Sequence, residues 1–340
     1  MPPQLRLHCF TVVPLSVLDL SPVGVSSTPC QAILDSTALA CRCDTLGYTR
    51  YWVAEHHAMA NIAASAPEVL IAHIAATTTR MRIGSGGIML PNHNPLRVVE
   101  IFRTLEALHP NRIDLGLGRA PGTDPVTAAA LQRGTGDDPN SQLAEVLAFA
   151  GATFPDQHPF RGIVPMPSGV ALPPIWMLGS TRGGASIAAS LGLRYAFAGH
   201  FAMQNAKAAI AWYRDQFTPS VDLPVPYAML AVTVVCGPDD DQAARMAAPI
   251  RLAVVRNRTG RRAPIASVDE ALAYRFTPEE EAIADDFLMG AIIGGPQRVL
   301  DGLTALARDS GADELMLSTL LPDRDERQLS YERGSAAAGL

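Results

Sequence analysis

Five short clusters of histidine, glycine, arginine and serine could do chemistry, because each directly follows an apolar, strand-like run. Histidine accepts or donates a proton near neutral pH. Glycine lets backbone N–H groups approach a bulky ligand, and arginine pairs with anions. These residue types indicate a site that binds an anionic cofactor and moves protons. The clusters are residues 55–57, 84–87, 118–119, 179–184 and 199–200.

The paired histidines His56 and His57 are the first candidates for acid–base work. Adjacent side chains of an extended segment point to opposite sides, so only one of the two can face a shared site. Capping or core packing is the alternative for this pair. A zinc site would need a third ligand such as Glu55 or His200, and the helical His-Glu-x-x-His spacing is absent. We therefore predict no metal.

Arg119 ends an otherwise apolar run, where a buried guanidinium without an anion would be costly. Its partner is either a ligand phosphate or a nearby carboxylate, Asp114 or Asp124. The sequence alone leaves both possibilities open.

The segment 179–184, Gly-Ser-Thr-Arg-Gly-Gly, leads directly into a predicted helix. The first backbone N–H groups of such a helix can bind phosphate. Alternatively, Ser180 or Thr181 caps the helix. Because Arg119 ends the preceding strand-like run, the pair of segments favours phosphate binding.

Eight strand-like runs alternate with helical patterns along the whole chain. This order predicts parallel strands with crossover helices, and the count of eight favours a closed (β/α)₈ TIM barrel over an open doubly wound sheet. The carboxyl ends of barrel strands meet at one face, so the five clusters are expected to converge there. The runs are 15–20, 51–54, 81–90, 112–117, Ile175–Gly179, 195–198, 227–236 and 314–319, and the helical patterns include Pro95–Leu108 and 184–191.

The domain organisation follows from the length of 340 residues. We expect an N-terminal extension over 1–14 and one barrel domain over 15–340. Long insertions are predicted before strand 5, at residues 154–174 with six prolines, and between strands 7 and 8, at residues 251–278. Loops of this length are usually functional lids or lack fixed structure. A new helix is predicted to begin at Thr277.

Composition excludes several classes of protein. A net charge of −6 and a pI near 5.7 argue against a nucleic-acid-binding surface. The apolar runs fall well short of the roughly 20 residues that span a bilayer. Five cysteines without Cys-x-x-Cys spacing support neither a disulfide framework nor a zinc site, and no secretory signal is apparent. We expect a cytoplasmic protein that binds neither membrane nor nucleic acid.

Longer motifs surround the clusters. They are Leu-Gly-Tyr-Thr-Arg-Tyr-Trp-Val-Ala-Glu-His-His at 46–57, Arg-Ile-Gly-Ser-Gly-Gly-Ile-Met-Leu-Pro-Asn-His at 82–93, Leu-Glu-Ala-Leu-His-Pro at 105–110 and Arg-Ile-Asp-Leu-Gly-Leu-Gly-Arg at 112–119. With these motifs the sequence resembles the bacterial luciferase-like monooxygenases, in particular the subgroup that includes the luciferase-like oxygenase of mensacarcin biosynthesis. The resemblance runs from residues 15–19 to 311–316.

The resemblance implies a TIM barrel that binds FMN as FMNH₂, supplied by a separate NAD(P)H:flavin reductase. It implies acid–base work by His56, with His57 as the second candidate, and a substrate contact for Ser21 and His200. It also implies a cis peptide bond between Gly86 and Gly87. The residues expected around the flavin and its phosphate are Gly86, Gly87, Gly118, Arg119, Gly179, Ser180, Thr181 and Gly184. Of these, Gly118 replaces a cysteine of luciferase and Gly184 replaces a serine of close relatives.

The predicted function is that of a flavin-dependent monooxygenase. It would use FMNH₂ and O₂ to hydroxylate or epoxidise a small organic substrate in polyketide-type secondary metabolism, as a homodimer. One alternative is a deazaflavin-dependent hydride-transfer dehydrogenase on the same barrel. Another is a non-catalytic FMN-binding flavoprotein.

Overall fold

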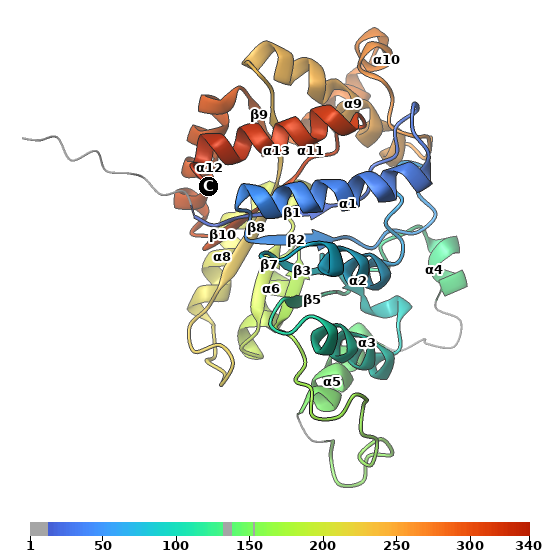
Figure 1. The fold of residues 1–340 in the computed structure, drawn as a ribbon, viewed down its shortest axis with the longest axis vertical. Coiled ribbons are helices and arrows are strands. Elements are labelled where there is room, and N and C mark those ends of the chain that lie inside the picture. Colours follow the sequence, from blue (N-terminus) through green and yellow to red (C-terminus); the bar gives the residue numbers. More distant parts are fainter. Residues whose placement is uncertain (1–12, 132–137, 152–153) are drawn as a thin grey trace, which may run out of the picture.

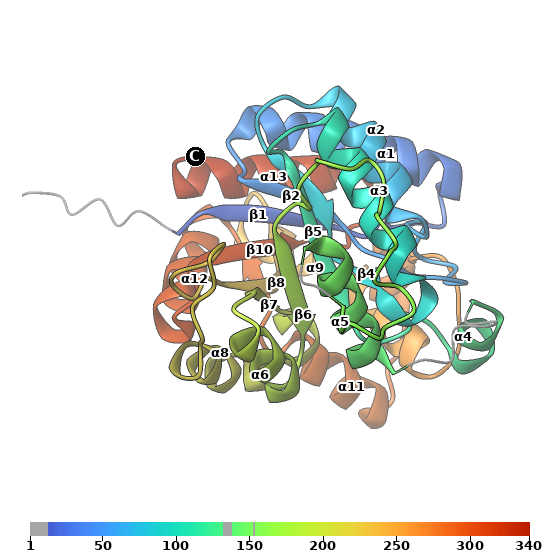
Figure 2. The same cartoon turned by 90° about the horizontal axis from the view of Figure 1, so that it is seen from below.

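A closed barrel of eight parallel strands lies at the centre of the computed structural model, which describes residues 13–131, 138–151 and 154–340. Strand β10 pairs with both β8 and β1, and this closes the ring. Figure 2 shows the strands at the centre with helices around them. The predicted (β/α)₈ barrel is therefore confirmed. Its strands are β1 (Leu15–Asp19), β2 (Arg50–Val53), β3 (Arg82–Ser85), β5 (Ile113–Gly118), β6 (Ile175–Gly179), β7 (Arg194–Phe197), β8 (Ala228–Cys236) and β10 (Glu314–Ser318).

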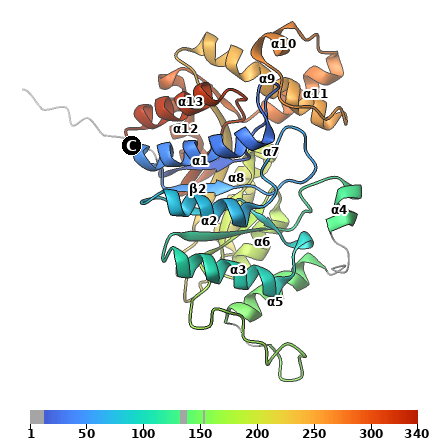
Figure 3. The same cartoon turned by 45° about the vertical axis from the view of Figure 1, so that its right-hand side comes forward.

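Helices between the strands cover the outside of the barrel, and α1, α2 and α3 lie side by side along one flank (Figure 1, Figure 3). Many of them begin with a proline. Proline lacks an N–H group, and the N–H groups of a first helical turn have no partner within the helix in any case. Helix α3, which Asn94 caps, has the predicted bounds. The helices are α1 (Pro29–Leu46), α2 (Pro67–Thr77), α3 (Pro95–Leu108), α4 (Pro125–Leu131), α5 (Pro139–Ala150), α6 (Arg182–Ser190), α7 (Gly199–Ala202), α8 (Ala206–Asp215), α9 (Asp240–Arg258), α10 (Val268–Ala273), α11 (Pro278–Leu288), α12 (Pro296–Ser310) and α13 (Arg324–Ala338), with 3₁₀ turns η1 (Leu90–Asn92) and η2 (Met203–Asn205).

The strands alternate between two cores. On β2, Tyr51 and Val53 pack against the surrounding helices, whereas Trp52 packs inside the barrel with Trp176 and Met316. This period of two is the pleat of a β-strand. At the carboxyl end of each strand, this alternation directs every second side chain into the mouth of the barrel.

Ion pairs fill the barrel at the amino ends of its strands. Arg50 lies 2.8 Å from Asp114 and 3.0 Å from Glu314, and Arg82 lies 2.8 Å from Asp114. Trp52 also donates its indole N–H to Asp114 over 3.1 Å. Both carboxylates are fully buried, so these donors compensate the cost of burying their charge. Charged side chains thus fill the amino end of the barrel.

Two predicted segments differ from the structure. The run 81–90 is broken into β3 and the short β4 (Ile88–Met89). The peptide bond between Gly86 and Gly87, which lie between these two strands, is cis, as the resemblance implied. The predicted loop 251–278 is wrong over its first part, since α9 extends to Arg258 and α10 follows. The extra helices α9, α10 and α11 gather at one end of the molecule (Figure 1). The helix predicted from Thr277 is confirmed, with Thr277 and Glu280 forming a capping box.

Other predictions concern segments with little regular structure. Residues 154–174 contain neither helix nor strand, as their prolines predicted. The three-residue strand β9 (Ile292–Gly294) beside β8 was not predicted. Of the proposed extension 1–14, residues 1–12 lie outside the described residues. None of the helices in the described part of the chain has the length and apolar character needed to cross a bilayer.

Candidate cofactor and substrate cavity

A cavity of about 460 Å³ opens at the carboxyl ends of the barrel strands. This volume falls within the range of small-molecule sites. Its inner walls are apolar and include Trp52, Leu178, Met229 and Met316. Eight of the predicted site residues line it: His56, Gly86, Gly118, Arg119, Gly179, Ser180, Thr181 and His200. The strand ends therefore bring together most of what the sequence marked as one site.

Arg119 has no carboxylate partner among the described residues. Asp114 pairs with arginines of the barrel floor, and Asp124 lies 3.0 Å from Arg262. The guanidinium of Arg119 instead donates Nη1 to the amide oxygen of Asn140 over 3.3 Å, and its shielded Nε has no partner. The structure thus answers the question that the sequence left open, because neither of the two carboxylates neutralises this charge.

The first turn of α6 lies beside that guanidinium. A Cβ atom on Gly183 would lie 3.8 Å from Nη2 of Arg119. Thr181 is the N-cap residue, and neither it nor Ser180 caps the helix with its side chain. The first N–H groups of a helix without a side-chain cap form a ready anion site. Arg119, Ser180 and Thr181 together can hold a phosphate.

His56 and His200 are the two histidines of the cavity. Burial lowers the pKa of His56 to about 4, although the charge of Glu55 opposes this shift. Burial likewise lowers the pKa of His200 to about 3, with a further lowering from His56. In both rings Nδ1 is shielded from solvent and has no partner among the residues that the structure describes. Both imidazoles are therefore neutral at pH 7, and each can donate at one nitrogen and accept at the other.

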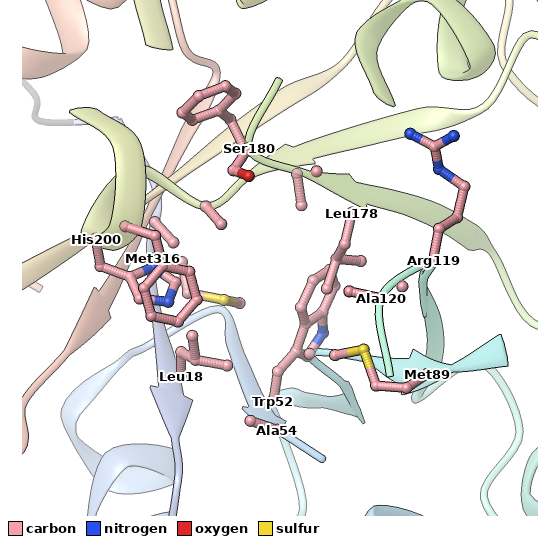
Figure 4. Close-up of a pocket in the computed structure, with 18 of the residues that line it drawn as sticks. Leu18, Trp52, Ala54, Met89, Arg119, Ala120, Leu178, Ser180, His200 and Met316 are labelled. Atoms are coloured by element: carbon pink, nitrogen blue, oxygen red, sulfur yellow. The ribbon is translucent and has the colours of Figure 1, made fainter. Parts of the chain in front are cut away.

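The two ends of the cavity differ in chemistry. Figure 4 shows Arg119 on one side and His200 beside Met316 on the other, with Trp52 and Leu178 between them. Arg119 and Asp138 are the charged side chains in the described lining. Asp138 lies two residues from Asn140, the partner of Arg119. Formal charge is therefore confined to one end, and the remainder of the cavity is apolar apart from its two neutral histidines.

Four predicted site residues do not line the cavity. His57 turns outward, with Nε2 lying 2.8 Å from Glu55, and the Ser21 hydroxyl accepts a hydrogen bond from Ser36 over 2.8 Å. Gly87 packs so tightly that a Cβ atom would lie 2.7 Å from the Gly116 carbonyl oxygen. Gly184 is buried where α6 meets the end of β6. These residues shape the walls from behind.

Sequence reasoning missed several lining residues. Trp52 and Ala54 alternate with outward residues ahead of His56, so the strand pleat could have identified both. Asn140 and Phe201 come from α5 and α7. Their place beside the cavity depends on how these helices pack, and no local signal in the sequence indicates it.

The chain is similar to known proteins along nearly its whole length. The family model for luciferase-like monooxygenases matches residues 13–314. The Bacillus subtilis protein YvbT is 41% identical over 324 residues, a match that covers 94% of each chain. An Escherichia coli K12 protein described as a luciferase-like monooxygenase is 37% identical over 323 residues, covering 94% of this chain and 95% of its own. The crystal structure of apo-MsnO8 is 36% identical with a TM-score of 0.89, covering 97% of this chain and 99% of that chain.

Proposed function

This chain belongs to the luciferase-like monooxygenase family, and from that premise we propose that it is a monooxygenase that uses reduced FMN and O₂. The observation that carries the proposal is Arg119, a guanidinium without a carboxylate partner among the described residues, beside the first turn of α6 at the cavity rim. A terminal phosphate monoester would satisfy both groups. FMN carries such a phosphate at the end of its ribityl chain, and its ring would occupy the cavity.

The residues present fit this cofactor. Arg119, Ser180 and Thr181 would hold the phosphate through charge-assisted and helix N-terminal hydrogen bonds. The apolar walls would pack against the ring, and His56 and His200 would face it as neutral donors or acceptors. When bound, the reduced flavin supplies the electrons that activate O₂.

The substrate we propose is a small, uncharged organic molecule. Beyond the end of the cavity that holds Arg119, the described lining offers no charged side chain. A carboxylate or sulfonate buried there would lack a counterion, at considerable cost. We propose that one oxygen atom enters this molecule by hydroxylation or epoxidation and the other leaves as water. A role in polyketide-type secondary metabolism is part of the proposal and rests on the resemblance to the mensacarcin subgroup.

The reducing equivalents would come from a separate partner. We propose that an NAD(P)H:flavin reductase supplies FMNH₂, as the resemblance to bacterial luciferases implies. Each turnover would then consume one FMNH₂ and one O₂ and return oxidised FMN.

Rapid mixing tests the proposal. The protein with photoreduced FMN is mixed with oxygenated buffer while flavin absorbance is followed. We expect a flavin species that outlasts the rapid reoxidation of free FMNH₂. Reoxidation at the rate of free FMNH₂ would indicate a flavin-binding protein without oxygenase activity. Reduction of an added deazaflavin by an alcohol, without any need for O₂, would instead indicate a dehydrogenase.

A further inference from the structure

Glu55 is a fully buried carboxylate behind the cavity wall. Its Oε2 accepts hydrogen bonds from the Met89 amide and from His93 Nε2, each over 2.9 Å. Its Oε1 accepts from Asn92 Nδ2 over 2.9 Å and lies 2.8 Å from His57 Nε2. Hydrogen bonds to its charged form lower the pKa of Glu55 against the opposing effect of burial. This carboxylate therefore remains charged and joins the end of β2 to the β4–η1 segment.

The contact between Glu55 and His57 spans His56. Residues 52, 54 and 56 line the cavity and residues 53, 55 and 57 do not, so the alternation of β2 continues past its end at Val53. The side chains of Glu55 and His57 therefore lie on the same side of the chain, away from the cavity. The hydrogen bond between Glu55 and His57 fixes both side chains on that side of the chain. Pleat geometry then turns His56 the opposite way, into the cavity that it lines.

No hydrogen bond from the described part of the chain orients the buried imidazole of His56, so the direction of the ring is set by packing and by the backbone that carries it. Its Nδ1 is shielded and unpartnered, and the backbone N–H of His56 donates to the Ala64 carbonyl over 2.9 Å. The Thr123 hydroxyl donates to the His57 carbonyl over 2.8 Å. The direction of the ring thus depends on the backbone of residues 55–57 rather than on a partner of its own.

We propose that the Glu55–His57 hydrogen bond is a clip that positions His56 in the cavity. His57 is then a positioning residue, which explains why both members of the histidine pair are polar although only one lines the cavity. The catalytic meaning of the clip rests on the proposed function, whereas the geometry that it enforces does not.

His93 provides a matched comparison for His57. Both histidines reach Glu55 through Nε2, at 2.8 Å for His57 and 2.9 Å for His93, and their side chains are 17% and 23% exposed. Only the hydrogen bond of His57 to Glu55 joins the two sequence neighbours of His56. His93 instead lies in the loop after η1. Loss of either should weaken the network around Glu55, but only loss of His57 should release His56.

The experiment measures the pKa of His56 by NMR of the imidazole groups in the full chain, which contains 8 histidines. The His56 signal is assigned by its loss in His56→Asn. His57→Leu removes the donor, His57→Gln keeps a donor at a similar reach, and His93→Leu removes the matched donor. We expect His57→Leu to raise the pKa of His56 by about one unit or more toward its usual 6.5, since a released ring becomes solvated.

The comparison variants decide the result. His57→Gln also removes the imidazole but keeps a hydrogen-bond donor, so it should retain the wild-type pKa of His56 only if the hydrogen bond is what matters. His93→Leu should lower the melting temperature and move the pKa of His56 by less than about 0.3 unit. Equal shifts in His57→Leu and His93→Leu, or no shift in His57→Leu, would overturn the clip. Because neither flavin nor substrate is present, this result is independent of the monooxygenase assignment.

Discussion

The indole rings of Trp52 and Trp176 meet edge to face, with centroids 5.2 Å apart and planes at 80°. The two rings separate two environments. Below them, Trp52 Nε1 donates to Asp114 over 3.1 Å, and the Arg50 guanidinium lies 5.0 Å from the centre of the Trp176 ring. Above them, Trp52 lines the cavity. The pair keeps the charges of the barrel floor away from the apolar part of the site.

The two tryptophans differ in one respect that a stability measurement can detect. Trp52 is 1% and Trp176 is 0% exposed, but the indole N–H of Trp176 finds no partner within the described part of the chain. Trp52→Phe should therefore lower the free energy of unfolding by about 1–3 kcal/mol more than Trp176→Phe does, since it removes a donor from a buried carboxylate. Urea unfolding of both variants gives the difference. Equal losses would mean that the bond to Asp114 contributes nothing.

The proposed phosphate site leads to a prediction about ligand selectivity. Arg119→Ala should raise the dissociation constant for FMN by roughly ten- to a hundredfold, because a hydrogen bond to a charged group contributes about 1.5–3 kcal/mol. Riboflavin lacks the phosphate, so its affinity should change by less than about twofold. Fluorescence titration with the two flavins measures both constants. A parallel loss for FMN and riboflavin would mean that Arg119 supports the cavity wall rather than the phosphate.

His56 should matter for turnover more than for binding. Its ring lines the cavity close enough to His200 to lower the pKa of that residue, and His200 lies across the cavity from Arg119 (Figure 4). His56→Ala should therefore change the FMN dissociation constant by less than about threefold. Product formation should fall by roughly a hundredfold or more, the usual scale for a lost acid or base. Hydrogen peroxide release per O₂ consumed should rise. The assay compares O₂ uptake, peroxide and product with a substrate that the wild-type protein oxidises, and unchanged coupling would exclude His56 from the chemistry.

Local patterns predicted the barrel and most of the cavity. Alternating apolar residues locate the strands, and glycine or polar residues at strand ends locate the mouth, so Arg119 and His56 could be found without coordinates. The residue pattern alone could not say which of His56 and His57 faces inward, and only the family resemblance favoured His56. That choice depends on Glu55, whose other partners come from residues 89–93, more than thirty positions along the chain.

The insertion shows where local reasoning fails. The arginines after residue 250 resemble a charged loop, yet they pair across the insertion. Arg251 lies 2.6 Å from Asp285 on α11, and Arg256 lies 2.7 Å from Glu270 on α10. These ion pairs link α9 to α11 and α10, beside apolar contacts between the same helices, and their partners are 34 and 14 residues away in the sequence. A pattern read over one or two helical turns cannot detect such pairing.

The histidines of the cavity should make stability fall on the acid side of neutrality. His200 has a pKa of about 3 in the folded chain and about 6.5 when unfolded. Between these values the unfolded chain binds a proton that the folded chain does not, so stability is fully present above pH 6.5 and declines as the pH falls toward 3.

His200→Asn removes this titration and allows it to be measured. Asparagine is polar and smaller and cannot take up a proton in this range. From pH 7 to pH 5 the wild-type protein should lose up to about 2 kcal/mol of unfolding free energy relative to the variant, the value that linkage gives for the two pKa values of His200. Other titrating groups are common to both proteins and cancel in the difference. Urea unfolding at pH 7, 6 and 5 supplies the two curves. If they run parallel, His200 is solvated in the folded chain and takes up a proton there as readily as in the unfolded chain, and it could not then serve as a neutral hydrogen-bonding group in the cavity below pH 6.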